Sequence, residues 1–244
     1  MVQRQTTLVL LPGLDGTEVL LRPLLAVLPH WIRPVVVTYP IAGDNGYPAL
    51  LALARRAIAE IDECVVLGWS FAGPLALMLG AAEPQKVRGV ILVASFARSP
   101  SRRLSQLRFA LAAPAVWVWR AARRLPLWLF KPQSDELRRA KSETWQRVPA
   151  SVVAARLRAI DAVDVTPLLR TCAQPVLYVA SSEDRIVPSH NAHDVLQLLP
   201  TAKFVTIAGP HLALFTNPDA AAAAIAEFSH QAVMAFPVYR AASA

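Results

Sequence analysis

Val65-Val66-Leu67-Gly68-Trp69-Ser70-Phe71-Ala72-Gly73 is an apolar strand pattern that runs directly into a serine between small residues and then into a helical segment. A serine on a sharp turn between a strand and a helix needs small residues two positions away on either side, because bulky side chains there would collide across the turn. Gly68 and Ala72 meet this need. The pattern therefore predicts a nucleophilic Ser70; the alternative interpretation is a plain glycine-rich turn.

The rest of the chain alternates short β-branched runs with longer amphipathic segments. This alternation is typical of an α/β fold, in which a mostly parallel sheet is covered by helices on both faces. Six strands are predicted, at residues 6–11, 33–39, 64–67, 89–94, 176–180 and 203–208. Helices are predicted at residues 18–28, 48–61, 70–83, 189–199 and 219–234. Ligands should then gather at the carboxyl ends of the strands.

The alternation stops between Arg98 and Thr166, where arginines are interspersed with tryptophans and several prolines divide the chain into short helical pieces. We expect a helical cap, or lid, at residues 98–165, between two parts of one core at residues 1–97 and 166–244. Residues 101–165 carry 13 Lys and Arg against 5 Asp and Glu, whereas the remainder carries 12 of each kind. The net charge of +8 therefore lies within this insert.

A carboxylate and an imidazole follow two later predicted strands. Asp184 lies on the loop after the fifth strand, and His211 follows the sixth strand directly, unlike the other four histidines. A serine hydroxyl becomes a good nucleophile when a hydrogen-bonded histidine takes its proton, and a buried carboxylate holds that histidine in the right tautomer. Ser70, Asp184 and His211 are therefore the predicted catalytic residues. Glu183 is a rival for the acid, but the shorter side chain favours Asp184.

The glycine turn after the first strand, Pro12-Gly13-Leu14-Asp15-Gly16, is the remaining candidate. The backbone N–H of Leu14 is placed to join that of Phe71 in an oxyanion hole. A dinucleotide site is not expected, because the three-glycine spacing is missing and no acidic residue ends the second strand. A phosphate-binding lysine motif and a Cys/His metal cluster are absent from the sequence, so no cofactor and no metal are expected.

The two cysteines and the hydropathy pattern indicate the compartment in which the protein is expected. Cys64 and Cys172 are too few for a disulfide framework and are expected to fill space at strand edges. The longest uninterrupted apolar stretch, residues 109–119, is too short to span a bilayer, and residues 1–11 lack a secretory signal pattern. A cytoplasmic protein is expected.

With these elements in order, the sequence resembles the α/β-hydrolase superfamily over nearly its whole length, and within it the small bacterial carboxylesterases of the pimeloyl-carrier-protein methyl ester esterase type. The segments at residues 67–70, 184–188 and 210–211 carry the resemblance. It implies an α/β-hydrolase fold with an inserted cap, a Ser70-His211-Asp184 triad, and oxyanion amides from Leu14 and Phe71.

Three departures from the family pattern accompany this resemblance. Pro12 replaces a histidine before the oxyanion glycine, and Ala72 replaces a glycine after the nucleophile. The sequence also begins at what corresponds to the family's third strand, so the first hairpin of the sheet is expected to be missing. None of the three removes a catalytic group.

A tryptophan-rich and arginine-rich cap suggests an apolar acyl tunnel with a positive rim, lined by Trp69 and Trp117. The first hypothesis is a serine carboxylesterase for short- to medium-chain acyl esters, with solvated cap arginines. The second is an esterase, thioesterase or acyltransferase whose basic cap docks an acidic carrier protein, a coenzyme A thioester or an anionic lipid surface. A binding protein without turnover is a third, less favoured hypothesis. Nucleic-acid binding is not expected, and the oligomeric state stays open.

Overall fold

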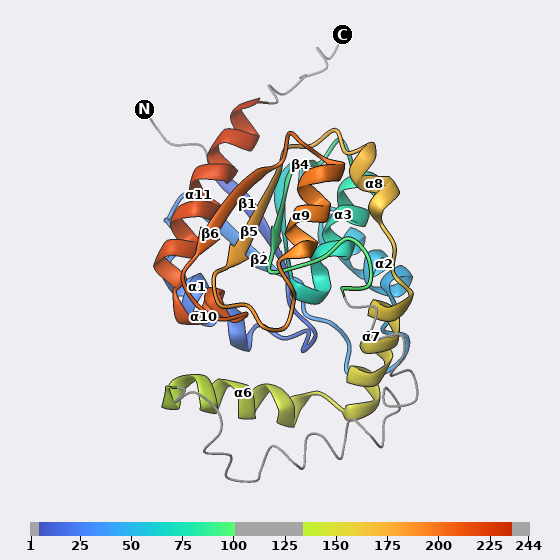
Figure 1. Cartoon of the computed structure of the whole chain (residues 1–244), viewed down its shortest axis with the longest axis vertical. Helices are drawn as coiled ribbons and strands as arrows, with labels where there is room; N and C mark the ends of the chain where they lie inside the picture. The colour runs from blue at the N-terminus through green and yellow to red at the C-terminus, as the bar shows by residue number, and fades with distance from the viewer. Residues whose placement is uncertain (1–4, 101–133, 236–244) are drawn as a thin grey trace.

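A six-stranded parallel sheet forms the centre of the protein (Figure 1). The computed structural model describes residues 5–100 and 134–235 of the 244-residue chain. In spatial order the strands run β2-β1-β3-β4-β5-β6, and each neighbouring pair is parallel. Their bounds are β1 (Thr6–Leu11), β2 (Ile32–Val36), β3 (Cys64–Trp69), β4 (Val87–Val93), β5 (Val176–Ser181) and β6 (Lys203–Ile207). The predicted parallel sheet of six strands is confirmed.

Helices cover both faces of this sheet. One face packs against α2, α3, α8 and α9, and the other against α1, α10 and α11 (Figure 1). The helical segments of the core are η1 (Val19–Leu21), α1 (Arg22–Val27), α2 (Tyr47–Ala57), η2 (Ser70–Ala72), α3 (Gly73–Ala82), α8 (Thr166–Arg170), α9 (His190–Leu198), α10 (Ala213–Thr216) and α11 (Pro218–Ala235).

Strand β3 shows why its sequence is a continuous apolar run. Val65 and Leu67 point into the core beneath α1 and α11, whereas Val66 points into the core beneath α2 and α3. Successive side chains of a strand point to opposite faces, so a strand covered on both sides must be apolar at every position. All six residues of β3 are buried accordingly.

The segment predicted as a strand at residues 33–39 ends earlier, at Val36. The reason is a contact with another loop: the backbone N–H of Tyr39 donates to the carbonyl of Gly16, 2.8 Å away. The predicted helix at residues 48–61 likewise ends early, at Ala57. Lys86 Nζ donates to the carbonyl oxygens of Ile58 at 3.2 Å and Ala59 at 2.5 Å, so backbone acceptors just beyond the helix end have a side-chain donor.

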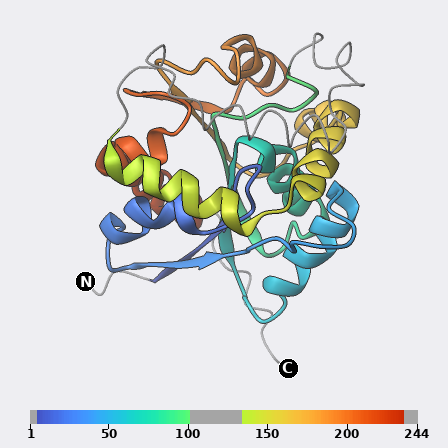
Figure 2. The ribbon, with the colours of Figure 1, turned by 90° about the horizontal axis from the view of Figure 1, so that it is seen from below.

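Two helices of the predicted cap lie at the carboxyl ends of the strands, α6 (Asp135–Arg147) and α7 (Ala150–Ala162) (Figures 1 and 2). Ser134 caps the first turn of α6 by accepting a hydrogen bond from the backbone N–H of Leu137 at 3.2 Å. Pro149 separates the two helices, as the proline pattern predicted. Residues 101–133 of the expected cap, including Trp117, lie outside the described residues.

The two ends of the expected insert lie side by side. Arg98 and Asp164 form an isolated antiparallel bridge. Beside it, the backbone N–H of Val165 donates to the carbonyl of Ala97 at 2.7 Å. The chain therefore leaves and rejoins the sheet region at adjacent points. The division into a core and a cap at residues 98–165 stays a prediction.

Four partly exposed charged side chains join α6 of the expected cap to the core, and we call them the cap ion pairs. The Arg22 guanidinium binds both carboxylate oxygens of Glu143 at 2.9 Å. Arg147 lies 3.1 Å from Glu18 and 2.5 Å from Glu143. The Arg22–Glu143 and Arg147–Glu18 pairs connect α6 with the η1–α1 segment, whereas the Arg147–Glu143 pair lies within α6. Of the helices within residues 5–100 and 134–235, none combines the length and the apolar character needed to cross a membrane.

Candidate active site

Ser70 lies at the turn between β3 and α3, with a backbone φ of 53°. Residues other than glycine seldom adopt this left-handed backbone conformation, so the surrounding structure must stabilise it. One contact does so: the Ser95 hydroxyl donates to the Ser70 carbonyl at 2.5 Å. The turn is also tight, because a Cβ on Gly68 would lie 2.3 Å from the carbonyl oxygen of Ala72, so glycine alone fits there. The turn therefore presents the serine hydroxyl at the carboxyl end of the sheet.

His211 follows β6 and reaches the same point. Its Nε2 atom lies 2.8 Å from Oγ of Ser70, although 141 residues separate the two along the chain. The imidazole is nearly buried, with 9% of its side chain exposed, and it packs beside the indole of Trp69 with ring centroids 6.5 Å apart. This packing and the hydrogen bonds at both ring nitrogens restrict the ring to one orientation.

Asp184 completes the group from the loop after β5. Its Oδ2 lies 2.7 Å from Nδ1 of His211, and its Oδ1 accepts hydrogen bonds from the backbone N–H groups of Ile186 at 2.8 Å and Val187 at 2.9 Å. Burial raises the pKa of this carboxyl, but the hydrogen bond and charge of His211 and the two amides outweigh burial, so the pKa is lowered from the usual 3.8. The neighbouring Glu183 has an exposed side chain.

The structure thus brings the three predicted side chains together in a hydroxyl–imidazole–carboxylate chain. An imidazole in this arrangement can accept the hydroxyl proton, and the carboxylate stabilises the imidazolium that forms. Such a group suits acyl transfer through a covalent intermediate. Within the described residues, no cluster of His, Cys, Asp or Glu is arranged to hold a metal ion.

The glycine turn after β1 lies beside Ser70. A Cβ built on Gly13 would be 3.9 Å from Cβ of Ser70. The turn is closed by a hydrogen bond from the N–H of Gly16 to the carbonyl of Gly13 at 3.0 Å. Phe71 lies in the first turn of the helical segment, where N–H groups have no partner within the helix. An oxyanion hole built from the Leu14 and Phe71 amides stays a prediction, and these positions are compatible with it.

Sequence reasoning missed the residues that support the two amides. Tyr47 donates its hydroxyl proton to the carbonyl of Phe71 at 2.8 Å, and its ring stacks on Phe71 with centroids 4.9 Å apart. Behind the glycine turn lies Arg156 of α7, which is fully buried. In the sequence Arg156 is one of many cap arginines, and nothing local distinguishes it. Ser95 could have been found, because it is a polar residue shortly after the end of β4.

The remaining candidates lie as follows. Trp69 is only 2% exposed, and its Nε1 has no hydrogen-bond partner among the described residues. Its predicted role in lining an acyl tunnel stays a prediction, as does that of Trp117. Both cysteines are free, and burial raises the pKa of the Cys64 thiol to about 12, which disfavours a thiolate nucleophile there.

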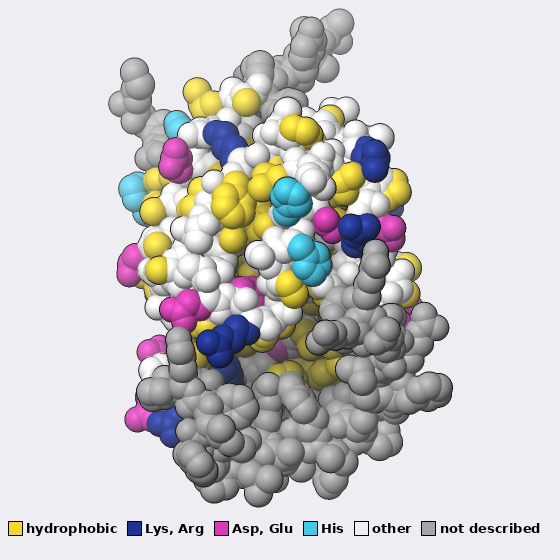
Figure 3. Space-filling model, viewed as in Figure 1, with side chains coloured by type: hydrophobic (Ala, Val, Ile, Leu, Met, Phe, Trp, Pro, Cys, Tyr) yellow, Lys and Arg dark blue, Asp and Glu magenta, His cyan; other side chains and the backbone are white. Residues whose placement is uncertain are grey.

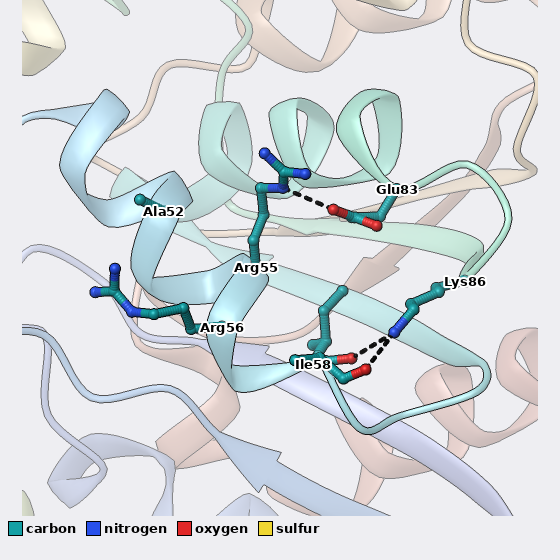
Figure 4. A pocket seen from close by; sticks show the side chains of 7 residues that line it. Ala52, Arg55, Arg56, Ile58, Glu83 and Lys86 are labelled. Atoms are coloured by element: carbon teal, nitrogen blue, oxygen red, sulfur yellow. Dashed lines mark hydrogen bonds and ion pairs between the residues drawn. The ribbon is translucent and has the colours of Figure 1, made fainter.

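A separate hollow lies at the other end of the sheet, by the residues that precede β3 and β4 (Figure 4). Three of its four charged side chains are engaged with the protein itself: Arg55 pairs with Glu83 at 2.6 Å, and Lys86 binds the carbonyls of Ile58 and Ala59 just after α2. Because Ser70 follows the carboxyl end of β3, this hollow is not part of the candidate active site.

Residues 8–224 match the alpha/beta hydrolase family, so the chain belongs to this family. It is 28% identical over 214 residues to the pimeloyl-[acyl-carrier protein] methyl ester esterase of Edwardsiella ictaluri, which covers 77% of each chain. It is also 27% identical over 228 residues, 89% of its own length, to the biotin biosynthesis bifunctional protein BioHC of Cellvibrio japonicus, of which it spans 44%.

Among solved structures, a thermophilic esterase from Thermogutta terrifontis has a TM-score of 0.78 at 19% identity, with 94% of this chain and 91% of that chain covered. At this identity the likeness shows the fold alone. The family match and the esterase relatives, on this shared fold, show that the chain is a carboxylic ester hydrolase.

Proposed function

We propose that the protein is a serine carboxylesterase that hydrolyses short- to medium-chain acyl esters through Ser70, His211 and Asp184. The observation that carries the proposal is the pair of contacts at His211: 2.8 Å from Nε2 to the Ser70 hydroxyl, and 2.7 Å from Nδ1 to the Asp184 carboxylate. One imidazole bonded on both sides has the geometry of a general base with an oriented tautomer.

The reaction then has two halves. His211 takes the hydroxyl proton as Ser70 Oγ attacks the ester carbonyl, and the carbonyl oxygen becomes an oxyanion that the Leu14 and Phe71 amides would bind. The C–O bond to the alcohol breaks, the alcohol leaves with the proton from His211, and an acyl-serine remains. A water that loses its proton to His211 attacks this ester, and the acid is released as Ser70 regains its proton.

A second candidate is an ester carried on an acidic protein. Two observations favour it: the net positive charge of residues 101–165, and the relative from Edwardsiella ictaluri that is named for an acyl-carrier-protein ester. On the face drawn in Figure 3, basic and acidic side chains are interspersed. Because the excess positive charge lies in residues 101–165, a carrier-protein docking face would depend on the expected cap. Acyl transfer to an acceptor other than water would use the same acyl-enzyme.

The test of the esterase is a series of nitrophenyl esters of increasing acyl length, assayed with the wild type and with Ser70→Ala. Wild-type turnover is expected on short chains, and the variant should lose at least about 10³-fold in kcat. Ser95→Ala is not a neutral control, because its hydroxyl bonds the Ser70 carbonyl. Ser142→Ala is a better one, because Ser142 is exposed on α6 and its hydroxyl accepts a hydrogen bond from Gln146 of the same helix. Equal rates in wild type and Ser70→Ala would refute the proposal.

Ionic strength separates the two substrate classes. If the basic cap docks an acidic carrier, kcat/KM on the carrier-bound ester should fall steeply with added salt, while hydrolysis of a neutral nitrophenyl ester stays flat. Flat salt dependence for both substrates would favour the small-ester hypothesis.

A further inference from the structure

Arg156 of the cap helix α7 has a guanidinium with 0% exposure, surrounded by hydrogen-bond acceptors of the core. Nη1 donates to the Leu14 carbonyl at 2.8 Å. Nε and Nη2 donate to Oδ1 of Asn45 at 3.0 and 2.8 Å, and Nη2 also donates to the Pro40 carbonyl at 3.1 Å. All these acceptors are uncharged. Burying a cation costs several kcal/mol in principle. The buried Asp15 carboxylate of the glycine turn offsets part of this cost through its charge, so the guanidinium is held by the turn itself.

The contact with Leu14 matters because both peptide groups of this residue are then held. The carbonyl of Gly13 accepts the N–H of Gly16 at 3.0 Å, and the carbonyl of Leu14 accepts Nη1 of Arg156. In a planar trans peptide the C=O and the following N–H point in opposite directions, so holding the Gly13 carbonyl also sets the direction of the Leu14 N–H. The bond from Arg156 holds the peptide on the other side of Leu14.

The turn is packed closely against the guanidinium. Gly16 has a φ of 70°, and a Cβ there would lie 2.7 Å from Nη1 of Arg156 and 2.7 Å from the ring of Tyr39. The Tyr39 hydroxyl donates to the Pro12 carbonyl at 3.0 Å, and its ring centroid lies 5.2 Å from Cζ of Arg156. The turn is thus clamped between the cap helix and the segment that follows β2.

We propose that Arg156 is a positioning residue, through which the cap helix α7 sets the direction of the Leu14 amide at the oxyanion. The inference rests on the proposed esterase function and deepens it. This cap arginine neither solvates a helix face nor meets a substrate. Through Arg156, the position of α7 determines whether the glycine turn after β1 can bind the oxyanion.

The test compares Arg156→Ala and Arg156→Lys with a matched variant, Ile160→Ala. Ile160 is a buried residue of the same helix that packs in the hydrophobic core, and its side chain has no group that could hydrogen-bond to the turn. On a short nitrophenyl ester, Arg156→Ala should lose about 10²-fold in kcat with KM changed less than about threefold, because a small misplacement of a catalytic donor costs about this much. Ile160→Ala should lose thermal stability without this loss of kcat.

The lysine variant keeps the charge but lacks the planar fork that reaches Leu14, Asn45 and Pro40 together. It should fold even where the alanine variant does not, and it should lose about tenfold in kcat. In the alanine variant, millimolar guanidinium should restore part of kcat, because the ion fits the vacated space. Urea at the same concentration should restore less, because it carries no charge and has fewer donors.

Three results would overturn the inference: unchanged kcat in a folded Arg156→Lys, equal kcat losses in Arg156→Ala and Ile160→Ala, or a loss confined to KM. The proposed function is tested separately by Ser70→Ala. If the wild type depends on Ser70 and the Arg156 variants keep full kcat, the positioning role fails while the esterase stands. If the wild type hydrolyses no ester, the esterase itself fails.

Discussion

Asp184 meets His211 with one carboxylate oxygen and two backbone amides with the other. Oδ2 lies 2.7 Å from Nδ1 of the imidazole, while Oδ1 accepts the N–H groups of Ile186 and Val187. The carboxylate plane is therefore fixed from the side opposite the histidine. Because one oxygen bonds to His211 and the other to the loop amides, replacing one oxygen should affect catalysis and folding separately.

Asp184→Asn is expected to lower kcat by about 10⁴-fold, because an amide does not hold the imidazole in the tautomer that accepts the serine proton. Oδ1 of asparagine can still accept the two backbone amides, so the loop should keep its shape. The measurement is kcat on a short nitrophenyl ester together with a thermal melt. Glu183→Gln is the matched control, because it neutralises the neighbouring carboxylate on an exposed side chain, and it should retain activity.

A pH dependence of stability follows from the same carboxyl. Its pKa is lowered in the folded protein from the usual 3.8, so the native state favours the ionised form. The stabilisation is therefore fully present well above 3.8 and is lost as the pH falls through the lowered pKa. Urea midpoints of wild type and Asp184→Asn, measured from about pH 7 to about pH 3, should converge at the acid end.

The pKa of the buried Asp15 is shifted in the opposite direction, because burial raises it. Its contribution is present in both proteins and cancels in the difference between their midpoints. A gap between wild type and Asp184→Asn that widens toward low pH would contradict the assignment.

Gly68→Ala should disable both folding and activity, because the added Cβ meets the Ala72 carbonyl oxygen at 2.3 Å and backbone cannot move aside as a side chain can. We expect a loss of about 3 kcal/mol or more in the free energy of unfolding. Gly43→Ala provides the comparison: it also changes a glycine, with a φ of 73°, but has no atom within 4 Å of the new Cβ, and only the strain of about 1 kcal/mol should appear. Chemical denaturation of both variants measures the difference, and equal losses would show that packing at position 68 is not decisive.

The cap ion pairs should make the seating of α6 sensitive to salt. The Arg22 and Glu143 side chains are 48% and 34% exposed, so salt screens their attraction. Raising NaCl to about 1 M should speed amide hydrogen exchange in α6, by no more than about fivefold for pairs this exposed. Glu143→Gln should reproduce the effect at low salt. Asp135→Asn, which removes a pair within α6 itself, should leave the contact with the core unchanged; a larger effect from Asp135→Asn would place the salt sensitivity within the helix.

Local patterns predicted much of this protein. The strands β1, β3 and β5 begin at the predicted residues, because a strand buried on both faces needs an unbroken apolar run that is visible in the sequence. Ser70 was also predictable from a local pattern, because the close approach that requires glycine at position 68 is to Ala72, only four residues away in the sequence. Asp184 and His211 were predictable from their positions directly after strands whose carboxyl ends must share one edge of the sheet.

Tertiary contacts decided the rest. The early end of β2 depends on a bond between Tyr39 and Gly16, and the rivalry between Asp184 and Glu183 was open until the loop geometry turned one carboxylate toward His211. Arg156 is the clearest case, because its 0% exposure arises from Leu14, Pro40 and Asn45, more than 110 residues earlier in the chain. The sequence by itself determined the order of elements and the chemistry at their ends, which are local properties. Which arginine is buried and what it holds is a property of packing, and distant segments decide packing only once the chain has folded.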